Sequence, residues 1–326
     1  MATFPRTKKK VLVVANDAGG AEIVSAYLLA KKEYISPHCI VRGPAARIFE
    51  RKGLRKRILK TEDARGTLAR FPGISLVLTG TSARSALERD ALRAAKERGI
   101  RSAAYLDHWV GYRERFGYPR AGWRKTLPTE LWVGDHFALR KARSLFGKKV
   151  RIRYVRNHFF DETITLYRRA RMGARGRRNP TLMFVSQPHS ALRGPLAKGT
   201  PDEIALLRRL CHRFALVPRP PRILVRLHPA EKRRKYRNLA RLFTHRLSIK
   251  ESASASPWNE VARSSCIVGI DSMLLYLAAL VGKKVVSISP RKLPFPPGSL
   301  ITRVPSLRRA IPLLSSICRD NKTFAV

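Results

Sequence analysis

The sequence predicts an α/β protein built from two Rossmann-like domains, and three observations support this prediction. The chain has 326 residues, which at roughly 100–200 residues per domain favours two domains. Hydrophobic residues make up 44% of the chain, enough for ordinary cores. Short β-rich runs alternate with amphipathic helical stretches, as in a parallel sheet covered by helices. The alternation stops once, near residues 166–180, and then starts again.

The first half contains six expected strands. The pattern predicts them at residues 11–15, 38–42, 75–79, 102–106, 130–133 and 150–155. Helices are expected at residues 21–32 and 45–52, and after the loop 80–82 as far as residue 98. Residues 112–129, rich in aromatic residues, Gly and Pro, indicate a functional loop or lid.

The second half repeats the alternation. Strands are expected at residues 181–185, 223–227, 266–268 and 284–288, and helices at residues 202–216, 230–243, 257–263, 272–281 and 305–317. We therefore predict a first domain at residues 1–160, a basic linker at 161–180 and a second domain at 181–326, whose last helix returns toward the first domain. Open α/β sheets bind ligands at the carboxyl ends of their strands, so a cleft is expected between the two halves.

The charge is strongly positive. Lys and Arg number 67 against 22 Asp and Glu, a net charge of +45 that is spread over both halves. Such a field favours nucleic acid, an anionic membrane surface or phosphorylated substrates. Arginine-rich coding bias is an equal alternative, so charge alone does not decide the function.

Several classes of protein are disfavoured. The four cysteines are scattered and form no C-x-x-C pair, so neither a zinc knuckle nor a disulfide framework is indicated. The apolar run 11–15 is too short for a signal peptide, and no stretch reaches the ~20 apolar residues of a membrane span. We expect a cytoplasmic protein, with peripheral contact at the inner membrane face left open.

The most informative segment is Val225–Glu231, where an expected strand meets His228 and Pro229. Pro229 fits the first turn of a helix, where its missing N–H is not needed. His228 would then lie beside a helix N-terminus and donate a hydrogen bond to a phosphate, with Arg226 adding charge. The alternative is a surface histidine at an ordinary helix start.

A second segment joins a strand to an apolar helix through Gly269, Ile270, Asp271 and Ser272. Ser272 and the N–H groups that follow it, from Met273 onward, are candidates to hold a phosphate. Asp271 would repel a phosphate, so we expect it to cap the helix or bind a ribose hydroxyl; simple capping is the alternative. Gln187 follows the strand 181–185 and is expected near the nucleotide base.

These two segments resemble the C-terminal half of GT-B enzymes such as bacterial sialyltransferases, CDP-glycerol glycerophosphotransferases and UDP-GlcNAc 2-epimerases. Those families share a His-Pro element after one strand and a Gly-x-x-Ser element that opens a later helix. Here the matching residues are His228-Pro229 and Gly269 to Ser272. The resemblance is specific over residues 181–290. It implies two Rossmann-like domains facing a cleft, with the second domain binding the phosphates of a nucleotide.

The loop after the first strand contains Asn16, Asp17, Gly19 and Gly20. Its two glycines allow a close backbone approach at a helix N-terminus. In GT-B folds this loop faces the acceptor, so these residues are candidates for the acceptor side. Asp17 is a candidate base, and a helix cap is the alternative.

Asp107, His108 and Trp109 follow the strand 102–106. An Asp beside a His can orient it and raise its basicity, so His108 is the favoured catalytic base and Asp17 an acceptor-positioning group. Trp109 is a candidate sugar platform, or else packs at the domain interface.

The leading prediction is a metal-independent glycosyltransferase. It would transfer a sugar or polyol phosphate from a nucleotide donor to a cell-envelope glycan or glycolipid, with no other cofactor. The absence of an Asp-x-Asp motif argues against the other major, metal-dependent glycosyltransferase fold. A nucleotide-sugar 2-epimerase is the first alternative, disfavoured because only seven acidic residues follow residue 165. A nucleic-acid-binding protein is the second, and the chain shows no signature of specific nucleic-acid recognition.

Overall fold

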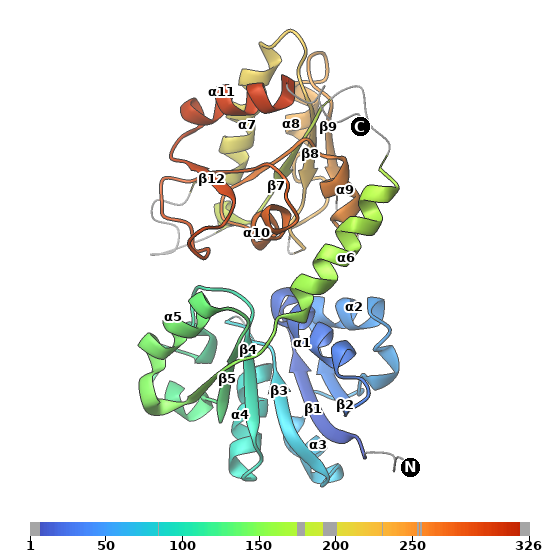
Figure 1. Cartoon of the computed structure of the whole chain (residues 1–326), viewed down its shortest axis with the longest axis vertical. Coiled ribbons are helices and arrows are strands. Elements are labelled where there is room, and N and C mark those ends of the chain that lie inside the picture. Colours follow the sequence, from blue (N-terminus) through green and yellow to red (C-terminus); the bar gives the residue numbers. More distant parts are fainter. Residues whose placement is uncertain are drawn as a thin grey trace, which may run out of the picture. The chain divides into compact units, whose positions relative to one another are not determined.

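The computed structural model describes residues 7–83, 85–174, 180–191, 201–229, 231–252, 254 and 256–319. The chain divides into two compact units, Met1–Glu162 and Thr163–Val326. Each unit is a six-stranded parallel sheet with helices packed against its faces (Figure 1). The predicted fold class, α/β with two Rossmann-like domains, is therefore confirmed.

The first unit has the strand order β2-β1-β3-β4-β5-β6. Its strands are β1 (Lys9–Ala15), β2 (Ile35–Val41), β3 (Ile74–Thr79), β4 (Ser102–Leu106), β5 (Glu130–Val133) and β6 (Arg151–Tyr154). Its helices are α1 (Ala18–Ala30), α2 (Gly43–Arg51), α3 (Ala64–Arg70), α4 (Leu87–Glu97) and α5 (His136–Phe146), with 3₁₀ turns η1 (Arg55–Arg57), η2 (Glu114–Phe116), η3 (Trp123–Thr126) and η4 (Gly147–Lys149). Helix α6 (His158–Met172) starts in this unit and ends in the next.

The central strand β1 shows why both faces of the first sheet are covered. Successive side chains of a strand point to opposite faces. Val11 and Val13 belong to one buried cluster, whereas Leu12 and Val14 belong to another. A strand that is apolar at every position thus joins two cores, which is why the sequence reads as a continuous apolar run rather than an alternating one.

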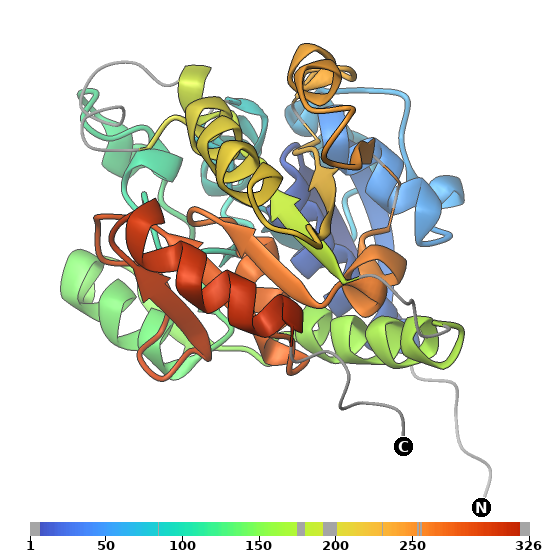
Figure 2. The same cartoon turned by 90° about the horizontal axis from the view of Figure 1, so that it is seen from above.

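The second unit has the strand order β12-β11-β10-β7-β8-β9. Its strands are β7 (Thr181–Val185), β8 (Arg222–Arg226), β9 (Ile249–Ser252), β10 (Cys266–Gly269), β11 (Val285–Ile288) and β12 (Ile301–Val304). Its helices are α7 (Glu203–Ala215), α8 (Arg237–Leu242), α9 (Trp258–Arg263), α10 (Met273–Leu280) and α11 (Leu307–Arg319), with the 3₁₀ turn η5 (His189–Ala191). Helices α7 and α11 lie side by side against this sheet (Figure 2).

Both sheets contain a point where the strand order reverses. In the first unit it lies between β1 and β3, and in the second between β7 and β10. Loops leave the carboxyl ends of such neighbouring strands in opposite directions, which opens a crevice for a ligand. These two places position the candidate site residues.

The structure corrects one expected helix. Instead of spanning residues 230–243, the helix α8 covers only Arg237–Leu242; Ala230 lies outside the described residues. The preceding segment forms turns because Glu251 accepts hydrogen bonds from the backbone N–H groups of Arg234 and Tyr236. A side chain from a distant strand thus overrides the local helical preference.

The sequence also missed some elements. The edge strands β9 and β12 are only partly buried and carry polar residues, so they show no apolar run. Of the expected linker, residues 161–172 belong to helix α6, and residues 175–179 lie outside the described residues. Within the second unit α11 contacts α7 and the strands β10 to β12. Its return toward the first domain stays a prediction.

Across the described residues, the structure contains no helix with the length and apolar character that crossing a membrane requires.

Candidate functional site

The loops after β7 and β10 bring three candidate residues together with His189, which was not singled out from the sequence, at the reversal point of the second sheet. The Gln187 side-chain oxygen accepts a hydrogen bond from the Asp271 backbone N–H at 3.3 Å. The carboxylate of Asp271 lies 3.1 Å from Nε2 of His189. Ser272 caps helix α10, since its hydroxyl accepts a hydrogen bond from the Leu274 N–H at 3.3 Å. Ser272 and not Asp271 therefore caps this helix, and the carboxylate of Asp271 lies beside His189; binding of a ribose hydroxyl, the other expectation for Asp271, stays a prediction.

His189 has a buried ring nitrogen, Nδ1, whose lack of a partner among the described residues indicates a ligand site. Only 10% of its side chain is exposed, and its Nδ1 atom has no hydrogen-bond partner among the described residues. The contact with Asp271 is not an aligned hydrogen bond, because Oδ1 of Asp271 also has no such partner, and it is an ion pair only when the imidazole is protonated. An unpaired buried polar atom costs roughly 1–3 kcal/mol. An imidazolium facing Asp271 through Nε2 would keep its Nδ1–H for an acceptor such as a phosphate oxygen.

The helix that starts at this cluster favours the same kind of ligand. The first N–H groups of an α-helix have no partner within the helix, and its N-terminus attracts negative charge. Met273 opens α10 directly after Ser272, so both residues belong to the first turn, whose N–H groups lack partners within the helix ladder. Gly269 ends the preceding strand, where an added Cβ atom would lie 3.1 Å from the Val185 carbonyl oxygen. Its place in the site is therefore to let two strands pack closely.

His228 lies at the end of β8, but not at a helix N-terminus as expected, since α8 starts only at Arg237. Instead, its backbone N–H donates a 2.7 Å hydrogen bond to the carboxylate of Glu231. The same carboxylate accepts a hydrogen bond from the Ser186 hydroxyl at 2.8 Å and pairs with Lys235. This buried network fixes the turn that carries His228. The sequence signal was a Glu three residues after His228, the spacing at which the Glu of a capping box accepts the N-cap backbone N–H.

Arg226 is occupied by protein groups. Its guanidinium donates to the carboxylate of Glu260 at 2.9 Å and to the backbone oxygen of Ser254 at 2.6 Å. Its side chain is 11% exposed. The structure thus places Arg226 in an ion pair beside the site rather than facing a ligand.

In the first unit, three loops meet at the reversal point between β1 and β3. An added Cβ atom on Gly20 would lie 3.0 Å from Cα of Gly80, and one on Gly19 would lie 1.8 Å from Oδ2 of Asp107. The two glycines do permit a close approach, as predicted. The groups that lie close to these glycines are Gly80 and Asp107 of the two neighbouring loops.

Asp17 holds the N-cap position of α1, yet its carboxylate makes no capping hydrogen bond. It accepts a 3.0 Å hydrogen bond from the side-chain amide of Asn16. The Asn16 backbone N–H donates a 2.9 Å hydrogen bond to Glu88. Sequence reasoning missed Glu88, a buried residue whose pKa is raised to about 7 by burial. Only the tertiary structure brings this first-turn glutamate of α4 beneath the first loop.

The structure places His108 and Asp107 in separate interactions. The carboxylate of Asp107 forms an ion pair with Arg115, and the Thr81 hydroxyl donates to it at 3.4 Å. His108 accepts a 2.9 Å hydrogen bond from the Trp109 backbone N–H at Nδ1. Its neutral ring then carries the proton on Nε2, so that nitrogen is a donor and not a base. Asp17 is the better candidate base in this geometry.

Trp109 is not a sugar platform. Its side chain is 2% exposed, and its indole N–H donates a 2.7 Å hydrogen bond to Asp135, the N-cap of α5. The ring therefore packs inside the first unit and offers no face to an acceptor.

No group of three or more His, Cys, Asp or Glu side chains within the described ranges is arranged to hold a metal ion. The arrangement gives no candidate metal centre there, and metal independence stays a prediction.

No protein-family model matches the chain, and no curated protein matches it at a significant level. Solved structures do match its fold. UDP-GlcNAc 2-epimerase from Methanocaldococcus jannaschii is 13% identical, with a TM-score of 0.67 over 96% of this chain and 93% of that one. The Neisseria meningitidis UDP-GlcNAc 2-epimerase bound to UDP-GlcNAc gives the same identity and TM-score over 96% and 92%. HepE of Anabaena in complex with UDP is 10% identical, with a TM-score of 0.63 over 96% and 91%.

The class of fold follows from this match. The two parallel α/β units of this chain form the GT-B fold, as the resemblance of its His-Pro and Gly-x-x-Ser segments implied.

Proposed function

We propose that this protein is an enzyme acting on a nucleotide-activated sugar, and that it transfers a sugar or polyol phosphate to an acceptor hydroxyl. The observation that carries the proposal is the cluster at the reversal point of the second sheet. There Gln187, His189, Asp271 and Ser272 meet at the N-terminus of α10, and a buried imidazole nitrogen has no partner among the described residues. This combination suits a nucleotide diphosphate. Three of the matching structures contain UDP or UDP-GlcNAc, so UDP is the first nucleotide to test.

In this proposal the cluster stabilises the leaving group. The Ser272 hydroxyl, the N–H groups of the first turn of α10 and Nδ1 of His189 donate to the diphosphate as its charge develops. His228 adds a donor from the neighbouring strand end, held in place by Glu231. Asp271 balances His189 and leaves its second oxygen for a ribose hydroxyl. Arg226 acts indirectly, by keeping the segment after β9 in place.

Asp17 is the proposed base. In sugar transfer the acceptor hydroxyl attacks the sugar carbon, its proton passes to Asp17, and the bond to the nucleoside diphosphate breaks. In polyol-phosphate transfer the hydroxyl attacks the phosphorus that carries the polyol, its proton passes to Asp17, and a nucleoside monophosphate leaves. His108 donates a hydrogen bond from Nε2 to the acceptor or the sugar. Within the described part of the first sheet edge, Asp107 is paired with Arg115, and Glu88 lies buried beneath the loop. Asp135 caps α5 and accepts the Trp109 indole N–H, so among the described residues there Asp17 is the carboxylate with neither an ion pair nor a capping hydrogen bond.

The acceptor we propose is a cell-envelope glycan or glycolipid on the cytoplasmic side of the membrane. The net charge of +45 would favour an anionic membrane surface or a phosphorylated acceptor. Transfer by direct displacement needs one base and a stabilised leaving group, so no further cofactor is part of the proposal.

A 2-epimerase is the second candidate, because several of the matching structures are UDP-GlcNAc 2-epimerases. Epimerisation removes a proton from the sugar and returns one, so it needs an acid and a base that both reach the sugar ring. Asp17 and His108 could supply such a pair. The transferase is preferred because the remaining carboxylates at this edge are paired or buried.

One experiment separates the two. The protein is incubated with UDP-GlcNAc in D₂O and followed by proton NMR, first alone and then with an acceptor mixture from cell envelopes. A transferase releases UDP only with acceptor and leaves the C2 proton in place. Exchange of that proton without acceptor identifies an epimerase. If no nucleotide among CMP, CDP, UDP, GDP and ADP raises the melting temperature, the nucleotide site itself is refuted.

A further inference from the structure

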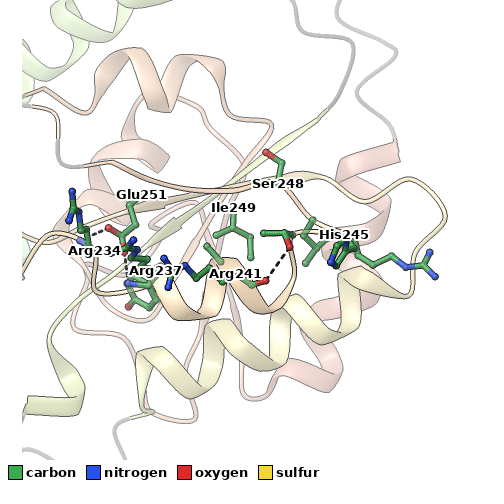
Figure 3. Close-up of a pocket in the computed structure, with 12 residues that line it drawn as sticks. Arg234, Arg237, Arg241, His245, Ser248, Ile249 and Glu251 are labelled. Atoms are coloured by element: carbon green, nitrogen blue, oxygen red, sulfur yellow. Dashed lines mark hydrogen bonds between the residues drawn. The ribbon is translucent and has the colours of Figure 1, made fainter.

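A basic groove lies along the edge of the second sheet, away from the reversal point. It runs between α8 and the edge strand β9, and its volume is about 810 Å³ (Figure 3). We call it the α8–β9 groove. Its basic lining residues are four arginines, Arg234, Arg237, Arg241 and Arg246, together with His245. They come from the segment after His228, but the strand β8 separates the groove from β7.

The cations follow a line. Arg237 and Arg241 are four residues apart on α8, so their side chains leave the helix on the same side, with Cβ atoms about 5–6 Å apart. His245 and Arg246 extend the row beyond the helix, as Figure 3 shows for Arg237, Arg241 and His245. A regular row of positive charges in a groove matches a linear polyanion better than a single phosphate.

No carboxylate among the described residues pairs with these arginines. The one acidic lining residue, Glu251, uses its two oxygens to accept the backbone N–H groups of Arg234 and Tyr236. All four arginine side chains are exposed. The groove therefore presents its positive charge to an incoming ligand.

Local stability does not account for these cations. Positive charge near a helix N-terminus is unfavourable, yet Arg234 and Arg237 flank the start of α8 and its first turn holds no acidic residue. Arg234 also has φ +66°, a left-handed conformation that costs a residue with a side chain about 1 kcal/mol or more. The strained backbone of Arg234 and the unfavourable charges of Arg234 and Arg237 at the start of α8 both lie in the lining of the α8–β9 groove, which indicates a binding role.

We propose that the α8–β9 groove binds a polyol-phosphate chain. Such a chain carries one charge per phosphodiester along a flexible backbone, so successive phosphates can meet successive arginines of the groove. A nucleic acid also carries one charge per phosphodiester but gains affinity by stacking its bases. The groove gives bases no exposed Phe, Tyr or Trp, since its one such lining residue, Tyr236, is 1% exposed. This inference does not depend on the proposed function.

The test uses the full-length chain and a synthetic, end-labelled glycerol-phosphate oligomer of about eight units, with binding followed by fluorescence anisotropy over a range of salt concentrations. The groove variant is R237Q/R241Q/R246Q. The control K96Q/K148Q/K149Q removes the same charge from exposed lysines in a basic pocket of the first unit. The groove variant should bind about tenfold or more weakly, with a salt slope lower by roughly 2, because about 0.7 counterion is released per phosphate. The control should bind like the wild type.

Three results would overturn the proposal. Equal losses in both variants would mean that net charge alone drives binding, and no loss in either would mean that the groove is not the site. Tighter binding of single-stranded DNA with the same number of phosphates would show that bases are recognised.

Discussion

The carboxylate of Asp271 lies 3.1 Å from Nε2 of His189, and this pair links the two strands on either side of the reversal point in the second sheet. The residues are 82 positions apart in the sequence. Their pairing leaves Nδ1 of a largely buried imidazole without a protein partner among the described residues. The arrangement therefore holds an unpaired ring nitrogen near the N-terminus of α10, which is a donor when the imidazole is protonated.

His189→Ala should weaken UDP binding by ~1–3 kcal/mol, the cost of losing a hydrogen bond to a charged group. Isothermal titration calorimetry measures this directly. The control is His212→Ala, an exposed histidine on α7 that should leave the affinity unchanged. Equal affinity for the His189 variant and the wild type would remove this residue from the site.

Asp17→Asn should lower kcat by ~10²–10⁴-fold with saturating donor, since it removes the proposed base. His108→Gln should lower it less, because glutamine retains a donor. Steady-state assays with the best donor and acceptor check this. The reverse order of effects would return His108 to the role of base.

Glu231→Ala should destabilise the second unit by ~3 kcal/mol. The change removes the buried carboxylate that Lys235, the Ser186 hydroxyl and the His228 N–H share, although Lys235 keeps Glu203 and Ser186 keeps Tyr236. Urea unfolding is the measurement. Glu97→Ala serves as control, because it breaks an ion pair with Arg65 whose side chains are 49% and 68% exposed. It should cost under about 1 kcal/mol. Similar losses in the two variants would contradict a structural role for Glu231.

Ionisation of Glu88 should make the protein less stable as the pH rises. Burial raises its pKa from 4.5 to about 7. Its contribution is thus fully present below pH 4.5, where both states are protonated, and is lost as the pH rises through about 7. Glu88→Gln removes this loss. The variant should match the wild type at pH 5 and be more stable by ~1–3 kcal/mol at pH 8. Urea unfolding at both pH values measures the free energy of unfolding of the two proteins. A difference between them that is the same at both pH values would refute the prediction.

Gly19→Ala should destabilise the first unit by ~1 kcal/mol or more, because the added methyl group would displace the Asp107 carboxylate from its place beside Arg115. Helix propensity alone predicts the opposite, a gain of up to ~1 kcal/mol in α1. The sign measured by thermal unfolding decides. Gly173→Ala, whose Cβ atom would meet its nearest neighbour at 3.9 Å, should show no such loss.

The sequence by itself determined the fold class and most of the elements that carry the site. Strands such as β4, β5 and β7 were predicted with their observed bounds, because buried parallel strands are apolar at nearly every position after the first and end at polar loops. The same rule placed Gln187, His228 and Ser272 at carboxyl strand ends. These features depend on neighbouring residues along the chain, so a linear pattern records them.

Only the tertiary structure decided which side chains meet. Helix α8 starts late because Glu251, from a distant strand, binds the backbone of the segment before it. His108 and Asp107 are neighbours in sequence but interact with Trp109 and Arg115, respectively. Trp109 is buried and donates a hydrogen bond to Asp135, and Glu88 lies beneath the first loop. Each outcome depends on contacts between residues far apart in the chain, where burial and charge pairing outweigh local preference.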